Sequence, residues 1–543
     1  MRTEEGITFQ ETPPGEEAPA PRRTSSLGRR LALVLGALVA TAGVLLASGV
    51  GVLGAKAANP RVRPDGPVTP MNLGVGPANN SPLLVADPTD ERFVVLANRL
   101  DAPDFGCALQ VSGDAGASWT TANPVPKLPE GAQKCYAPEA AFAQDGTLYY
   151  LFVGLRGEGN EPMGAFLTTS RDRGRSFSAP AQVLGPLKFA VRMAIDPASG
   201  PKGRIHMVWL EATSDPPLGG FGPPPNPIMA AYSDDGGKAF SKPVQVSDPT
   251  RQRVVAPALA LGPDHAVHVA YYDLEGDVRD YQGLQGPVWD EPWSLVMTSS
   301  TDGGRRFGPG VVVDAEVAPP ERVMLIFTMP PPSLVAHRRR LCVAWTDARH
   351  GDADAFSRCS GDRGRTWDRA RRMNDDALGN GRTQYLPRLA FGPDGRLDAI
   401  FYDRRRNPQN IGNEVFYTFS TDGGRNFASN VKLNREPSDS RIGQQYANVS
   451  AQGQFEFGSR LGLLARGDGA LAAWTDTRNT PRLLLDQDVF AAEVHLSKAG
   501  SRRLVGAGLA VVGLVVIAAA SRQSSSRRRG VARHKGSEGV SGA

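Results

Sequence analysis

One eight-residue pattern returns six times between residues 112 and 427 of this 543-residue chain. In each copy, Ser is followed by Asp two positions later, by Gly four positions later and by an aromatic residue seven positions later. Successive Asp residues are 58, 63, 67, 60 and 60 positions apart. A period of this length is typical of solenoids, propellers and other arrays of repeated units. The copies are Ser112–Trp119, Ser170–Phe177, Ser233–Phe240, Ser300–Phe307, Ser360–Trp367 and Ser420–Phe427.

The residue types in this pattern indicate a structural role. An Asp side chain accepts hydrogen bonds from nearby backbone N–H groups, and Gly permits the positive φ that a tight turn requires. The aromatic residue can pack back into the core. The pattern therefore predicts a turn between two strands, and we expect its Asp residues to stabilise the turn and not to bind a ligand.

A second pattern precedes each copy of the first. It consists of an apolar strand, a turn and another apolar strand that ends in a polar residue. The seventh copy is followed by a third strand, Asp488–Leu496, but by no fourth, which Val68–Val75 could supply. The copies are Ser81–Asn98, Pro138–Leu155, Arg192–Glu211, Pro257–Asp273, Pro332–Asp347, Pro387–Asp403 and Ser459–Asp476.

The six-fold pattern is the Asp box, also called the BNR repeat, and residues 66–497 resemble the Asp-box β-propeller proteins, best known through sialidases. The resemblance implies an all-β propeller of four-stranded antiparallel blades. Residues 56–497 divided by seven give roughly 63 residues per blade, which matches the box spacing. We therefore favour seven blades, and the six blades usual in sialidases are the alternative.

Two apolar stretches flank the repeats. Leu31–Ala55 and Leu504–Ala520 contain no charged residue, and basic residues lie beside the outer end of each. Both are long enough to cross a bilayer, and their basic flanks place both termini in the cytoplasm. Because Ala55-Lys56-Ala57 is a small-x-small site, the first stretch could equally be a cleaved signal peptide.

These features predict a protein of the cell membrane with its propeller on the extracytoplasmic side and a cytoplasmic C-terminus. The expected regions are a disordered cytoplasmic tail (1–30), a transmembrane helix or signal peptide (31–55), the propeller (56–497), a transmembrane helix (502–520) and a basic cytoplasmic tail (521–543).

The charge distribution argues against a nucleic-acid partner. The formal net charge is +5. Residues 521–543 alone contribute five Arg, one Lys and one Glu, which also sum to +5. The rest of the chain is therefore neutral, whereas a nucleic-acid-binding domain carries a basic patch.

The four cysteines are expected to form two disulfides, since an exported domain permits them. Cys342 and Cys359 lie at equal distances from the centre of the hairpin in the fifth repeat, so they should face each other on adjacent strands. Cys107 opens the third strand of the first repeat, and Cys135 lies in the segment entering the second repeat. We predict the pairs Cys107–Cys135 and Cys342–Cys359.

The inner strands suggest an anion site. One register-equivalent position near the mouth of the central channel is occupied by Leu83, Glu139, Arg192, Ala258, Ser333, Arg388 and Arg460. Three arginines suit a sugar carboxylate, because guanidinium binds carboxylate through paired hydrogen bonds. The resemblance implies the same, since sialidases use three arginines for this purpose. The family's Phe/Tyr-Arg-Ile-Pro motif is replaced here by Ser81-Pro82-Leu83, and ion pairing between blades is the alternative role.

A retaining sialidase also needs a Tyr nucleophile and a Glu that activates it. The candidates that the resemblance implies are Tyr385, Tyr402 and Tyr446 for the nucleophile and Glu139 and Glu456 for its partner. No local motif selects among them.

Several second strands end in an acid close to an arginine. These residues either form local ion pairs that brace the loops or surround a polar ligand on the upper face, which carries the loops between blades. They are Asp347, Arg349, Asp403, Arg404, Asp476 and Arg478. The loop His350-Gly-Asp352-Ala-Asp354 has oxygen ligands that suit Ca²⁺ but matches no established calcium loop, so no cofactor is expected.

The sequence thus predicts a membrane-anchored propeller that recognises a glycan or a cell-envelope protein on its upper face. The alternative is an exo-sialidase or other glycoside hydrolase that binds a sugar carboxylate through its arginines, and a scaffold for other membrane proteins is a third reading. Metalloprotease, serine-hydrolase, P-loop and dinucleotide-binding motifs are absent from the sequence.

Overall fold

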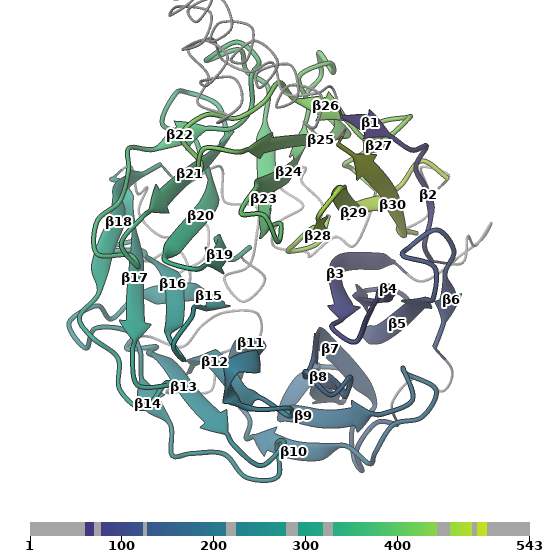
Figure 1. Cartoon of the computed structure of the whole chain (residues 1–543), viewed down its shortest axis with the longest axis vertical. Coiled ribbons are helices and arrows are strands. Elements are labelled where there is room, and N and C mark those ends of the chain that lie inside the picture. Colours follow the sequence, from purple (N-terminus) through teal and green to yellow (C-terminus); the bar gives the residue numbers. More distant parts are fainter. Residues whose placement is uncertain are drawn as a thin grey trace, which may run out of the picture. The chain divides into compact units, whose positions relative to one another are not determined.

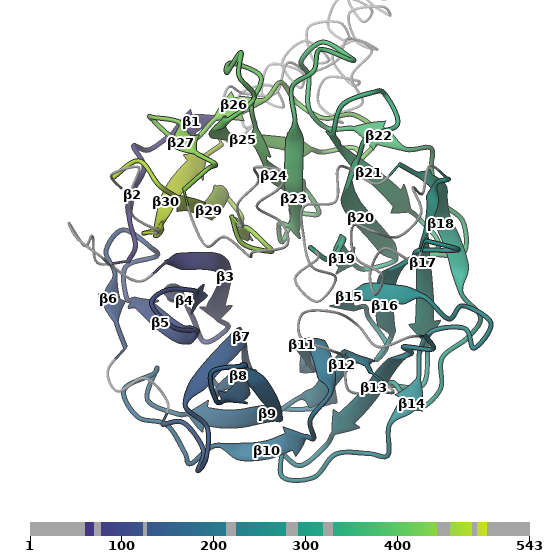
Figure 2. The same ribbon diagram turned by 180° about the vertical axis from the view of Figure 1, so that it is seen from behind.

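Seven antiparallel sheets surround a central axis and form a β-propeller (Figure 1). The computed structural model describes residues 60–69, 78–122, 127–212, 224–277, 291–318, 330–442, 457–479 and 486–496. In Figure 1 the inner strands are β3, β7, β11, β15, β19, β23 and β28, and Figure 2 shows the same ring from behind. The seven-blade prediction is confirmed, and the six-blade alternative is wrong.

Blades one to three are regular four-stranded sheets. Blade one contains β3 (Asn79–Asp87), β4 (Asp90–Leu100), β5 (Gly106–Ser112) and β6 (Thr120–Thr121). Blade two contains β7 (Lys134–Phe142), β8 (Leu148–Arg156), β9 (Glu161–Ser170) and β10 (Ala181–Leu184). Blade three contains β11 (Lys188–Asp196), a 3₁₀ turn η1 (Pro197–Ser199), β12 (Arg204–Glu211), β13 (Ile228–Ser233) and β14 (Val244–Gln245).

Blades four to six follow the same order. Blade four contains β15 (Val254–Leu261), β16 (Val267–Asp273), β17 (Trp293–Ser300) and β18 (Val311–Val317). Blade five contains β19 (Ser333–His337), β20 (Arg340–Asp347), β21 (Asp354–Ser360) and β22 (Arg371–Arg372). Blade six contains β23 (Gln384–Phe391), β24 (Leu397–Asp403), β25 (Gly412–Ser420), β26 (Val431–Lys432) and β27 (Ser438–Asp439).

Blade seven joins the two ends of the repeat region. Its first three strands are β28 (Gly462–Arg466), β29 (Gly469–Asp476) and β30 (Asp488–His495). Its outer edge is formed by β1 (Arg61–Val62) and β2 (Gly66–Pro67). In Figure 1 the purple β1 lies beside the yellow β30. The N-terminal segment thus supplies the missing strand, as expected. The strand residues are 61–62 and 66–67, which precede in sequence the segment 68–75 that was predicted. Of that segment, Val68 donates a backbone hydrogen bond to Val489 (2.7 Å).

Among the described residues, no helix is both long and apolar enough to cross a lipid bilayer. The apolar segments 31–55 and 502–520 lie outside the described residues, as do the tails 1–30 and 521–543.

The Asp boxes form the turns between third and fourth strands. In the box of blade five, Ser360 Oγ donates to Asp362 Oδ1 (2.7 Å), while the N–H of Gly364 donates to Ser360 Oγ (2.8 Å). Hydrogen bonds led by the N–H of Thr366 hold the pKa of Asp362 at about 2. Each box carboxylate is occupied by its own turn, which supports a structural role.

Several boxes also link neighbouring blades. Arg204 at the start of β12 donates to the carbonyl of Gly303 in the box of blade four (2.9 Å). Arg340 does the same to Gly423 in blade six (2.7 Å), and Arg466 to Ala115 in blade one (2.7 Å). The last of these spans the junction between the final and first blades, so it strengthens ring closure.

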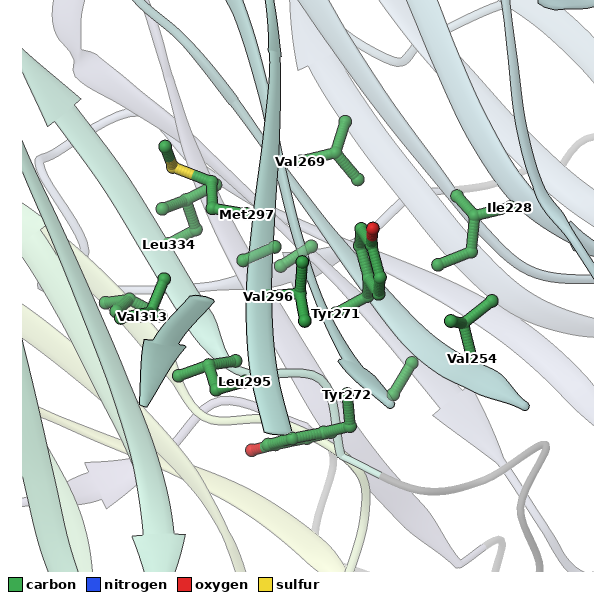
Figure 3. Packing of buried hydrophobic residues seen from close by; sticks show 14 of the residues in the cluster. Ile228, Val254, Val269, Tyr271, Tyr272, Leu295, Val296, Met297, Val313 and Leu334 are labelled. Carbon is green, nitrogen blue, oxygen red and sulfur yellow. The ribbon is translucent and has the colours of Figure 1, made fainter. Parts of the chain in front are cut away.

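The apolar core lies between the blades. Figure 3 shows one part of it, where Tyr271 and Val269 of β16 and Met297 of β17 lie among side chains of blades three to five. Tyr271, Val269 and Leu295 are fully buried. The alternation of side chains along each strand therefore fills both faces of a blade with apolar contacts, which stabilise the stacking of adjacent blades.

Both predicted disulfides are present, and no free cysteine remains. Cys342 and Cys359 are directly opposite in the register of β20 and β21, with Cα atoms 4.1 Å apart. Cys107 and Cys135 connect β5 of blade one to β7 of blade two, with Cα atoms 5.8 Å apart. The second bridge therefore ties two blades covalently, whereas the first lies within one.

Removing the interblade bridge should destabilise the propeller. The bridge closes a segment with a sequence separation of 28 residues. Restricting such a segment in the unfolded chain contributes about 3 kcal/mol. We expect the double variant Cys107→Ser/Cys135→Ser to lose roughly this much unfolding free energy in urea denaturation, and an unchanged value would contradict this role.

The ring-closing blade contains a buried pair of carboxylates. Asp476 and Asp488 are directly opposite across β29 and β30, and both are buried. Arg478 and the indole of Trp474 hydrogen-bond to Asp476, but Oδ1 of Asp488 has no hydrogen-bond partner within the described residues. Burial, and then the charge of Asp486, raises the pKa of Asp488 to about 7.

This shift predicts that stability falls as pH rises. The folded state keeps a proton on Asp488 that the unfolded chain loses near pH 4, so the unfolding free energy decreases between about pH 4 and pH 7. Asp488→Asn should be more stable than wild type at pH 8, by roughly 2 kcal/mol, with a smaller gain near pH 4. Urea denaturation at both pH values measures this difference, and equal stabilities at pH 8 would show that Asp488 carries no such penalty.

Candidate functional site

Two cavities meet at the mouth of the central channel. One, the upper pocket, has a volume of about 400 Å³ and is lined by residues of blades four to seven. The other is the channel itself, with a volume of about 440 Å³ and a lining of both polar and apolar side chains. Arg388 and Arg460 line both cavities, so they occupy the boundary where the two spaces join.

A repeated β-bulge directs side chains toward this boundary. In five blades the pairing register between the inner strand and the second strand shifts just before the equivalent position identified from the sequence. The residues at this position in the five blades are Leu83, Glu139, Arg192, Ala258 and Arg388. A residue with positive φ lies two positions earlier, and Gly458 takes this place in blade seven. Bulges re-aim a side chain relative to a regular strand. The positive-φ residues of the five strands are Ser81, Ala137, Ala190, Ala256 and Leu386.

The charged residues at this position converge. Glu139 of β7 accepts hydrogen bonds from Nη1 of Arg192 in β11 (3.3 Å) and from Nη1 of Arg460, two residues before β28. Arg460 also donates from Nε to the carbonyl of Ser81 (3.1 Å). The carboxylate of Glu139 therefore connects blades two, three and seven across the channel mouth.

Arg388 of β23 is different, because its guanidinium has no hydrogen bond or ion pair within the described residues. Its Nε is buried without a partner. Burial, and then the like charge of Arg460, lowers the pKa of Arg388 to about 10, with Glu139 acting in the opposite direction. The group stays charged at neutral pH, so a half-buried positive charge faces both cavities without a counter-charge of its own within the described residues.

The upper pocket combines aromatic and polar walls. Its aromatic lining comes from Tyr272, Trp293, Trp345, Tyr385 and Phe457. Its polar lining includes Thr346, Asp352, Thr383, Asn410 and Ser440. Asp352 Oδ2 accepts the N–H of Arg382 (3.1 Å), whereas Oδ1 is buried with no hydrogen-bond partner in the part of the chain described here. The pocket wall therefore contains an unpaired carboxylate oxygen below its surface, in addition to the unpaired guanidinium.

The candidate tyrosines are packed and have raised pKa values. The hydroxyl of Tyr402 donates to the carbonyl of Thr475 (2.8 Å), and burial raises the pKa of Tyr402 well above its ordinary value. Burial also raises the pKa of Tyr385, whose ring stacks on Tyr402 with 5.0 Å between ring centres. Glu139 is bonded to arginines and not to either tyrosine. Tyr446 and Glu456 lie outside the described residues.

The acid–arginine pairs at the strand ends are local braces. Arg349 donates from Nε to Asp347 (3.0 Å), and Arg478 from Nε to Asp476 (3.0 Å). In blade six the equivalent partner of Asp403 is Arg405 (2.8 Å), which the sequence interpretation had overlooked although it has the same two-residue spacing. Arg404 therefore does not form the local ion pair with Asp403, which was one of its two expected roles.

Arg404 instead contributes to the pocket wall. It donates to Asn413 Oδ1 (2.8 Å) and to the carbonyl of Asn410 (2.9 Å). Its guanidinium lies 5.1 Å from the ring centre of Tyr385. Both acceptors are neutral, so Arg404 lines the pocket without an ion-pair partner in the described part of the chain.

The acidic loop of blade five does not assemble a cation site within the described residues. Asp354 accepts hydrogen bonds from Arg372 Nε (2.6 Å) and Asn374 (2.7 Å). No group of three or more potential metal ligands occurs in the described ranges.

Comparisons with known proteins find similarity only among solved structures. No family model matches, and no curated protein sequence matches. A protein of unknown function from Dyadobacter fermentans is 14% identical, with 80% of this chain and 99% of that chain covered and a TM-score of 0.44. A Hadza microbial sialidase is 12% identical, with 76% and 75% covered and a TM-score of 0.42.

A polysaccharide lyase of family PL25, an ulvan lyase, is also 12% identical, with 77% of this chain and 94% of that chain covered and a TM-score of 0.42. Similarities at this level assign no substrate, activity or site residue to this chain.

Neutralising Glu139 should destabilise the ring. Glu139→Gln leaves Arg192, Arg388 and Arg460 at the channel mouth without a carboxylate, and breaking a buried ion pair costs about 3 kcal/mol. Glu161→Gln is the matched control, because the pair of Glu161 with Arg156 is largely exposed (side chains 66% and 62% accessible) and should contribute less than about 1 kcal/mol. Equal effects of the two substitutions in urea denaturation would contradict the importance of the central pair.

Proposed function

We propose that this protein is an extracytoplasmic propeller that binds an anionic saccharide where the upper pocket meets the channel, and that it does so without hydrolysing it. The observation that carries the proposal is the guanidinium of Arg388. It is charged, has no partner within the described residues, and lines both cavities. A buried charge is stabilised when an opposite charge pairs with it, and an acid group of a ligand would serve this purpose.

The walls of the upper pocket suit the rest of a sugar. Aromatic rings such as Tyr385 and Phe457 can pack against the apolar face of a pyranose. Polar side chains of the pocket wall, such as Thr383 and Ser440, can hydrogen-bond to the hydroxyl groups of a sugar. The volume of about 400 Å³ is in the range of small-molecule sites.

The tyrosine environment favours binding over hydrolysis. A phenol acts as a nucleophile when a neighbouring base or a lowered pKa activates it. Tyr385 and Tyr402 both have raised pKa values, and Tyr402 donates its proton to a backbone carbonyl. Neither contacts Glu139, whose hydrogen bonds come from arginines.

Exo-sialidase activity is the second candidate, favoured by the presence of Arg192, Arg388 and Arg460 in the lining of one cavity. A sugar carboxylate there would contact Arg388 directly. Catalysis would then need a nucleophile other than the two described tyrosines in their present environment.

The proposal also includes a membrane tether. The segments 31–55 and 504–520 have the length and basic flanks of membrane-spanning helices. Such a tether would hold the propeller at the cell surface, where glycans are exposed.

Substituting Arg388 tests the proposed function. Residues 59–497 contain every strand of the seven sheets, so this segment can be prepared without the flanking apolar stretches. We expect wild type to bind acidic saccharides in a glycan array and in titration calorimetry, and Arg388→Ala to weaken binding at least about tenfold, through loss of a charge-assisted pair. Arg156→Ala is the charge-matched control, because Arg156 lies outside both cavities and is exposed.

A parallel assay with fluorogenic sialosides separates the two candidates. Binding without release of the fluorophore supports the binding module. Release that Arg388→Ala abolishes would establish the hydrolase, and no binding to any acidic saccharide by a folded sample would refute the proposed function.

A further inference from the structure

The channel mouth carries an excess of positive charge. In the described part of the chain, three guanidiniums, those of Arg192, Arg388 and Arg460, lie with one carboxylate, that of Glu139, which leaves a formal charge of +2. The charges that act on Arg388 are those of Arg460, Glu139 and Arg192. Within the described residues, Tyr136 lies beside Arg192 and Tyr150 beside Arg460, and phenols are uncharged at neutral pH.

This excess is enclosed. The side chains of Arg460, Arg192 and Glu139 are only 10%, 16% and 7% accessible. Uncompensated charge in such a place is unfavourable, because the surroundings screen it less than water does. A carboxylate or a sulfate ester brings one negative charge and would leave one positive charge uncompensated. A phosphate monoester carries −1.5 to −2 at pH 7 and compensates nearly all of it.

We propose that the acid group recognised here is a dianionic phosphate monoester on a saccharide. This inference rests on the proposed function, since it specifies the ligand of the same site. A phosphate monoester presents three terminal oxygens, and the cluster presents guanidiniums from blades three, six and seven.

The hydrogen-bond donors needed for three oxygens are available. Arg388 uses none of its donors within the described residues. Arg192 uses only Nη1, toward Glu139 and the carbonyl of Val191 (3.3 Å each). Each guanidinium has five N–H donors, so the two arginines can donate to several oxygens while Glu139 keeps its existing bonds.

The proton chemistry of the ligand gives a signature. A phosphate monoester loses its second proton near pH 6, whereas sugar carboxylates and sulfate esters keep a constant charge between pH 5 and pH 7.5. Guanidinium groups do not lose their proton in this range. Affinity for the phosphate ester should therefore rise several-fold from pH 5 to pH 7.5, and affinity for the sulfate ester should change little.

Titration calorimetry of residues 59–497 with matched hexoses tests the inference, in a buffer free of phosphate and sulfate. The probes are glucose 6-phosphate, glucose 6-sulfate, glucuronate, glucose and inorganic phosphate, each at pH 5.0 and pH 7.5. We expect glucose 6-phosphate to bind at least about tenfold more tightly than glucose 6-sulfate and glucuronate at pH 7.5, and inorganic phosphate to bind more weakly than the ester, since it lacks the ring that the upper pocket would contact. Arg388→Ala should remove the preference for the dianion, and Arg156→Ala should retain it.

The outcomes separate this inference from the proposed function. Glucuronate or glucose 6-sulfate binding as tightly as glucose 6-phosphate would overturn the dianion assignment and leave an anionic saccharide site in place. Inorganic phosphate binding as tightly as the ester would overturn the assignment of a saccharide body. If none of the acidic probes binds to folded protein, both the inference and the proposed function fail.

Discussion

Closure of the ring is the constraint on which the rest of this structure depends. A four-stranded sheet leaves an edge whose backbone groups need partners, and seven such sheets form a closed ring only if the last one is completed. Here β1 and β2, from the start of the repeat region, pair with β30 at its end. The hydrogen bond from Arg466 to Ala115 then ties the final blade to the first. Without this closure the inner strands would not bring distant residues to one channel.

The same closed ring explains how a charged cluster forms from residues far apart in the sequence. Glu139 and Arg460 are 321 positions apart, yet they are hydrogen-bonded because blades two and seven both direct one equivalent residue toward the axis. The bulges in the inner strands supply this orientation. The ion pairs of Glu139 hold two arginines in place, and Arg388 remains charged and unpaired within the described residues. The channel mouth thus contains two arginines that are paired with Glu139 and one guanidinium, that of Arg388, that is available to a ligand.

The sequence predicted the parts that depend on local patterns. Box spacing and strand counting indicated seven blades, and the symmetric positions of Cys342 and Cys359 about a hairpin indicated their disulfide. Aligning the inner strands identified Glu139, Arg192, Arg388 and Arg460 as equivalent positions. Their mutual pairing could not be predicted, because it depends on which blades face each other across the channel. The two-residue spacing that relates Asp347 to Arg349 should have selected Arg405 and not Arg404 as the partner of Asp403. The upper pocket was missed because its walls combine loops and strand ends of four blades.

The central claim is that the unpaired guanidinium of Arg388 receives the acid group of a saccharide. A crystal structure of the propeller with a bound acidic saccharide tests it most directly. We expect the acid group to lie within hydrogen-bond distance of Arg388, with the sugar ring in the upper pocket near Asp352. A saccharide bound elsewhere, or an Arg388 already paired with a carboxylate of this chain, would contradict it.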